Sequence, residues 1–244
     1  MSLQQIVDVL IERGNDIVNR PRKRFDFTRE NTRGLSNKER HDRAEANDIL
    51  NDIETYPHVF VLGCLMDRQY SVEKCWIIPY HFVKDNRIGS FSFTALRGTS
   101  RKLVADWMSN PPKHRFHRAM ADVFYLGIQR IDKEYSGDAS KIWQGNPRAA
   151  TVIERFRAFK GAGSRIANMA AHILFHRFKV PMSDLSSIDI PADRHVCRVF
   201  QRLGLIRSDI PSAQAKEAVI AAARQFNPSY PAVFDRPAWR IGRR

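Results

Sequence analysis

This chain of 244 residues lacks several features that would place it in a familiar class. It has only three cysteines, Cys64, Cys75 and Cys197, in apolar contexts without metal-ligand spacing, so we expect buried free thiols in a reducing compartment. It has no low-complexity tract, and no apolar run reaches the roughly 18–20 residues that span a membrane. Its amphipathic, acid-containing start is unlike a signal or transit peptide. We therefore expect a cytoplasmic, globular protein without a membrane association.

Acidic residues are also scarce: 40 Lys and Arg stand against 26 Asp and Glu, for a net charge of +14. The excess is concentrated in two segments. Residues 95–165 carry 14 basic and 6 acidic side chains, and residues 194–244 carry 10 and 3. Two basic segments around a neutral stretch are typical of a cleft that grips a polyanion, so we predict nucleic-acid binding. The alternative is a soluble basic protein unrelated to DNA.

Helical periodicity dominates the rest of the chain. Residues 3–18 keep Ile6, Val7 and Leu10 on one face, and Ser36 followed by Glu39 is a capping-box signature. Apolar residues 58–66 and 72–83 fit strands or buried helices equally well. The pattern predicts an all-α protein with about ten helices and an irregular, basic segment at 19–38. Further helices are expected at 99–108, 116–135, 146–159, 164–178, 194–205 and 212–226.

One glycine-rich break, "FRAFKGAGSRIANMAAHIL" (156–174), separates two of these expected helices. Gly161 and Gly163 permit positive φ and close backbone approach, and a new helix starts at Gly163 or Ser164. The outward N–H groups of such a start form an anion site without any side-chain charge. This hairpin can hold a DNA phosphate regardless of base identity. The alternative is an ordinary glycine turn in a helical bundle.

A second segment, downstream of the hairpin, favours the anion-binding hairpin over an ordinary glycine turn. After a loop comes "IDIPADRHVCRVFQRLGL" (188–205). It contains Asp193, His195 and Arg198 at the spacing Asp-x-His-x-x-Arg. Hairpin and segment together resemble the helix-hairpin-helix (HhH-GPD) DNA glycosylase superfamily, which includes endonuclease III. "LGCLMDRQ" (62–69) resembles the family's helix that ends in an intercalating glutamine, and "PAWRIGRR" (237–244) resembles the segment before its iron–sulfur loop. The resemblance covers about residues 50–244.

The resemblance implies a two-lobed all-α fold with a cleft between the lobes. Residues 30–185 would form a helical barrel that carries the hairpin, and residues 1–29 plus 186–244 a second lobe with Asp193 at the cleft. It also implies a DNA glycosylase of base excision repair, which flips a base out of the duplex and hydrolyses its N-glycosidic bond. Asp193 would be the catalytic carboxylate and would also cap its helix. Asp184 and Asp189 are weaker alternatives.

The resemblance assigns DNA contacts as well. Gln69 would enter the base stack, and His195 would bond near the DNA backbone or cap its own helix. The remaining predicted contacts are the hairpin residues Lys160, Gly161, Gly163, Ser164 and Arg165.

Arg165 occupies the place of the lysine that family members with lyase activity use as nucleophile. Since arginine stays protonated, we expect a monofunctional enzyme. Lys160 as a lyase nucleophile, and a catalytically inactive DNA-binding protein, remain alternatives. Cys64 stands where adenine-specific members need a glutamate, which disfavours that activity.

The same resemblance bears on cofactors and partners. No cysteine lies beyond Cys197, so we expect no iron–sulfur cluster from this chain and no other metal. A monovalent cation at the hairpin carbonyls stays open. The expected partner is double-stranded DNA, bound by a monomer in the cytoplasm near the nucleoid. The excised base, and whether the chain continues naturally beyond residue 244, are left open.

Overall fold

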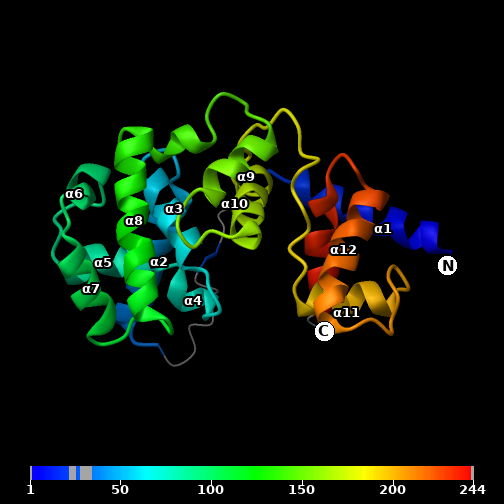
Figure 1. Cartoon of the computed structure of the whole chain (residues 1–244), viewed down its shortest axis with the longest axis horizontal. Coiled ribbons are helices and arrows are strands. Elements are labelled where there is room, and N and C mark those ends of the chain that lie inside the picture. Colours follow the sequence, from blue (N-terminus) through cyan, green and yellow to red (C-terminus); the bar gives the residue numbers. More distant parts are fainter. Residues whose placement is uncertain (1, 22–25, 28–34, 243–244) are drawn as a thin grey trace. The chain divides into compact units, whose positions relative to one another are not determined.

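The computed structural model describes residues 2–21, 26–27 and 35–242, and these form an all-α protein (Figure 1). The expected all-α class is confirmed: the described part contains isolated bridges but no named strand. The helices are α1 Leu3–Val18, α2 Asn37–Asn51, α3 Pro57–Met66, α4 Val72–Cys75, α5 Ile78–Asp85, α6 Phe93–Arg97, α7 Arg101–Ser109, α8 His117–Tyr135, η1 Ala139–Ile142, α9 Ala149–Arg157, α10 Ser164–His176, α11 Arg194–Arg202, α12 Ser212–Phe226, η2 Pro231–Phe234 and α13 Asp235–Gly242. None of the described helices is long and apolar enough to cross a membrane.

The undecided apolar segments are helical. Every residue of α3 is buried, so it has no polar face from which periodicity could have separated helix from strand. Residues 72–83 form α4 and most of α5, which begins next to Pro79. Of the basic segment 19–38, residues 22–25 and 28–34 lie outside the described residues.

Helix starts follow their capping residues. Ser36 Oγ accepts from the N–H of Glu39 at 3.2 Å, and Glu39 Oε2 accepts from the N–H of Ser36 at 2.8 Å, which confirms the capping box. Helix α9 begins three residues later than predicted. Arg148 instead pairs with Asp184 in an isolated bridge, and the N–H of Ala149 donates to the Asp184 carbonyl at 2.9 Å.

The chain divides into two compact units. Unit 1 comprises Met1–Lys23, Gly145–Glu154 and Ala167–Arg244, and unit 2 comprises Arg24–Gln144 and Arg155–Ile166. Helices α9 and α10 therefore contribute residues to both. The lobe boundaries inferred from the family resemblance remain a prediction.

Each unit has its own helical core. In unit 2, α8 packs against α7 and α3, around buried Phe60, Phe82 and Phe124. In unit 1, α11 packs against α12 and α13, and α1 packs against η2 and α13. The hairpin turn and the Gln69 loop belong to unit 2, and Asp193 belongs to unit 1.

Candidate nucleic-acid interface

The turn between α9 and α10 depends on one of its two glycines. Gly161 has φ +85°, a conformation that side chains rarely adopt. A Cβ there would also lie 2.9 Å from Cγ2 of Val123 on α8. Gly163 differs, because its φ is ordinary and nothing lies within 4 Å of a built Cβ. The turn therefore needs glycine at 161, whereas at 163 glycine leaves open space.

The turn is anchored on α8 by its apolar residues. Phe159 is buried, and its ring stacks on that of Tyr135 with centroids 6.2 Å apart. The Arg130 guanidinium lies over the same ring at 5.4 Å and donates through Nη1 to the carbonyl of Ala158 at 2.8 Å. These contacts fix the backbone of the turn against α8. The predicted contact residues Lys160, Gly161, Gly163, Ser164 and Arg165 are all exposed.

The turn leads into the N-terminus of α10, a helix of 13 residues. The first N–H groups of a helix have no partner within it, and they carry the positive end of the helix dipole. The first turn of α10 contains no acidic residue that would compete for this end. Exposure, absence of acid and the adjoining Lys160 make the turn suitable for a phosphate.

Arg165 ties the hairpin to the loop that follows α3. Its Nη2 donates to the backbone carbonyl of Asp67 and lies 3.5 Å from Asp67 Oδ1. Asp67 is buried and also accepts from the indole N–H of Trp76 at 3.1 Å. The Arg165 side chain is still 58% exposed. Its observed contacts are thus within the protein, and its predicted contact with DNA remains a prediction.

Gln69 lies two residues beyond Asp67. It is exposed and has φ +48°, a left-handed conformation that costs a residue other than glycine about 1–2 kcal/mol. Strain of this kind tends to persist at functional sites. Through Asp67 and Arg165, unit 2 brings the loop of Gln69 beside the hairpin. The structure therefore joins two features that the sequence analysis had placed almost 100 residues apart.

A basic and aromatic segment, which was not predicted from the sequence, lies next to this loop. The ring of Tyr70, adjacent to Gln69, lies 4.7 Å from that of buried His114. Phe116 is 36% exposed, with the Arg115 guanidinium 5.3 Å from its ring. The sequence "KHRFHR" (113–118) mixes basic and aromatic residues, and this pattern could have predicted the segment.

In unit 1, Asp193 is the N-cap of α11. Its Oδ1 accepts from the N–H groups of His195 at 2.8 Å and Val196 at 2.9 Å, which confirms the predicted cap. The residue is exposed, and Oδ2 takes no part in the cap. The catalytic role remains a prediction.

The two alternative carboxylates are more fully engaged. Asp189 forms a bidentate ion pair with Arg224, in which Nε donates to Oδ1 at 2.7 Å and Nη2 donates to Oδ2 at 2.8 Å. Asp184 accepts from the N–H of Ser186 at 3.0 Å and pairs with Arg148 at 3.3 Å. Bonding to Ser186, then the charge of Arg148, lowers the pKa of Asp184. Asp193 is thus the carboxylate of the three that has no basic side chain as ion-pair partner among the described residues.

His195 connects two helices of unit 1. Its Nδ1 lies 3.1 Å from the carbonyl oxygen of Gly242, which can only accept, so this nitrogen carries the proton. A Cβ at residue 242 would lie 2.6 Å from the His195 carbonyl oxygen, so glycine permits this approach of α13 to α11. The ring therefore has a packing role, and its predicted contact with DNA is an untested addition.

Cys64, Cys75 and Cys197 are buried free thiols, and the expected absence of an iron–sulfur cluster remains a prediction. Burial raises the pKa of Cys64 and of Cys75, so both are neutral thiols at neutral pH. Cys197 is buried in the other unit. Within the described ranges, no group of three or more His, Cys, Asp or Glu side chains is arranged to hold a metal ion. A monovalent cation at the hairpin stays an open prediction.

No family model matches this chain, and no curated protein matches it. Among solved structures, it is similar to endonuclease III trapped as a covalent intermediate with DNA, in an estranged-adenine complex, with 14% identity and a TM-score of 0.44. The match covers 82% of this chain and 86% of that one. Because this TM-score is low, neither fold nor activity is transferred from that protein.

Proposed function

We propose that this protein is a DNA glycosylase that releases a damaged, mispaired or modified base from double-stranded DNA. The observation that supports this most is the pairing, in unit 2, of the exposed hairpin with the strained loop of Gln69. A phosphate held by the hairpin fixes the strand without reading its sequence. The neighbouring amide side chain can then enter the base stack.

An enzyme that acts on a base must first take it out of the duplex. Extrusion leaves a gap, which Gln69 fills in this proposal. Gln69 is exposed, with a left-handed backbone, just beyond the buried end of α3, and the Arg165–Asp67 contact holds the loop in place. Tyr70 and Phe116 supply further ring surface beside it, on which bases can stack.

Cleavage of the glycosidic bond is assigned to Asp193. As the bond breaks, the sugar gains positive charge, which a carboxylate stabilises. Water adds to C1′ of the sugar and passes a proton to Oδ2 of Asp193, while the electron pair of the broken bond leaves with the base. The two N–H bonds to Oδ1 fix the direction of the carboxylate.

The enzyme is proposed to be monofunctional, leaving an abasic site. Arg165 stands where a lyase would carry its lysine, and a guanidinium stays protonated and cannot form a Schiff base. The exposed amine of Lys160, on the same turn, is the alternative nucleophile.

The test is a panel of duplexes, each with one deaminated, oxidised, alkylated or mispaired base, assayed for abasic sites. Asp193→Asn keeps the cap and should slow base release on the active substrate by at least about a hundredfold. DNA affinity should change little. Asp184→Asn is the matched control and should retain activity. Equal rates for Asp193→Asn and the wild type would refute the catalytic assignment.

Two outcomes would favour the alternatives. Borohydride trapping on abasic DNA that is lost in Lys160→Ala would show a lyase instead of a monofunctional enzyme. Salt-sensitive DNA binding without base release from any duplex would show a binding protein without catalysis.

A further inference from the structure

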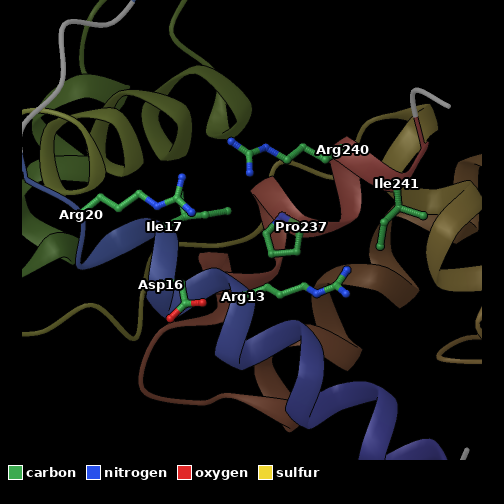
Figure 2. Close-up of a pocket in the computed structure, with 7 residues that line it drawn as sticks. All are labelled: Arg13, Asp16, Ile17, Arg20, Pro237, Arg240 and Ile241. Atoms are coloured by element: carbon green, nitrogen blue, oxygen red, sulfur yellow. The ribbon is translucent and has the colours of Figure 1, made fainter.

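Unit 1 contains a cavity of about 290 Å³ between residues of α1 and α13 (Figure 2). Three of its lining side chains are arginines: Arg13 on α1, Arg20 just beyond its end, and Arg240 on α13. The single acidic group in the lining is Asp16. The lining therefore carries two net positive charges.

Among the residues that the structure describes, these arginines lack the carboxylate partners that other arginines of unit 1 have. Arg224 is paired with Asp189 and Arg148 with Asp184. Within the described part of the chain, no carboxylate lies within 4 Å of the guanidinium groups of Arg13, Arg20 and Arg240. An anionic ligand would supply the missing counter-charge.

Two further basic residues, Arg177 and Lys179, interact with the helices that line the cavity. Burial and then the positive charge of Arg240 lower the pKa of Arg177, against the opposing effect of Asp235. Lys179 Nζ donates to the carbonyl of Val18, the last residue of α1. Since the C-terminal end of a helix is partially negative, Lys179 offsets a charge that would otherwise repel an anion from this end.

The remaining lining is apolar. Ile17 and Pro237 are buried, and Ile241 is 39% exposed. No side-chain amide or hydroxyl lines the cavity among the residues described. Guanidinium forks match the oxygens of a phosphate, and the apolar residues suit a sugar edge. Contacts of this kind with phosphate hold a strand without reading its sequence.

We infer that this arginine-lined cavity is a second site for the phosphodiester backbone of DNA, carried by unit 1. The identity of the polymer rests on the proposed function, whereas the phosphate chemistry rests on the cavity. The site is independent of the hairpin, since it consists of other helices in the other unit. It binds without sequence preference.

The test compares the wild type with the variant Arg13→Gln/Arg20→Gln/Arg240→Gln. Affinity for a short undamaged duplex is measured by fluorescence anisotropy between roughly 50 and 200 mM salt. We expect a loss of affinity of about tenfold or more at the lower salt, and a salt slope reduced by about one to two. The control, Lys38→Gln/Arg40→Gln/Lys102→Gln, removes the same charge from exposed positions on α2 and α7 and should keep the slope. All six positions are exposed, so folding should be retained.

The outcomes separate this site from the proposed function. Base release by the wild type, with equal slopes in both triple variants, would overturn the cavity site and leave the glycosylase standing. A reduced slope without any base release would sustain the site and refute the enzyme. A thermal shift with deoxynucleoside monophosphate that the cavity variant loses, without a change in DNA affinity, would show a free-nucleotide site and overturn the backbone assignment. Absence of DNA binding by the wild type would refute both.

Discussion

The starts of α10 and α11 use the same physics in opposite ways. Both helices begin with N–H groups that have no partner within the helix and with a positive dipole end. At α11 the chain satisfies its own N–H groups, because Asp193 accepts two of them. At α10 no acidic residue stands in the first turn, and the preceding glycines keep the backbone exposed. We call the start of α11, which is capped by its own carboxylate, the closed start, and the start of α10, which has no acidic residue in its first turn, the open start.

The difference shows why the two regions suit different parts of one reaction. A backbone anion site holds any phosphate and has no group that transfers a proton. A carboxylate that caps a helix repels phosphate, but its direction is fixed and its second oxygen can take part in the chemistry. The first, second and fourth of the following predictions test this contrast, and the third concerns the stability of both units.

The largest effect is expected when the carboxylate that caps the closed start is removed. Asp193→Ala should abolish base release as Asp193→Asn does, by at least about a hundredfold. It should also lower the free energy of unfolding by about 1 kcal/mol, because the cap is lost. Urea unfolding of both variants checks this, and equal stabilities would show that the cap contributes nothing.

The second prediction concerns the backbone of the open start. Gly161→Val places a branched side chain at φ +85° and against Val123. The strain and the clash should cost about 2 kcal/mol or more of unfolding free energy, and DNA affinity should fall with the distorted turn. Gly163→Ala is the control and should be nearly as stable as the wild type. If both variants unfold alike, the turn does not depend on Gly161 in particular.

Acid should destabilise both units, each through one buried histidine. Burial lowers the pKa of His58 on α3 to about 4, and burial with nearby positive charges lowers that of His176 at the end of α10 to about 3. Below the ordinary value of 6.5 the unfolded chain takes up protons that the folded chain refuses, so stability present at pH 7 declines as the pH falls towards 4 and 3. Each histidine should cost about 2 kcal/mol between pH 7 and 5.

Urea unfolding at the two pH values measures this decline. His58→Gln and His176→Gln should each remove part of it, since glutamine does not titrate. A decline that is unchanged in both variants would assign the acid sensitivity to other groups.

The smallest effect is expected when the open start is given its own acid. Gly163→Asp should stabilise α10 by about 0.3–1 kcal/mol, because a carboxylate now faces the dipole. It should weaken DNA binding by about tenfold, because the carboxylate competes with the phosphate. Gly163→Asn has the same shape without the charge and should bind more tightly than Gly163→Asp. Equal binding by the two variants would mean that no phosphate approaches this turn.

Local features of the fold were predictable from the chain. Periodicity and capping residues located most helices, since the Ser36–Glu39 box and the Asp193 cap depend on neighbouring residues alone. The failures came where distant segments intervene. Arg148 pairs with Asp184, and this bridge moved the start of α9. In α3 total burial removed the periodic pattern on which the prediction depended.

The candidate site divides in the same way. The sequence by itself determined the all-α class, the glycine turn at Gly161 and the capping carboxylate at Asp193, because each is decided by local backbone geometry and side-chain chemistry. Only the tertiary structure decided that Arg165 reaches Asp67 beside Gln69, that His195 bonds to Gly242, and that arginines of the first and last helices line one cavity. Those contacts join residues far apart in the chain, and packing between helices, which no local pattern encodes, brings them together.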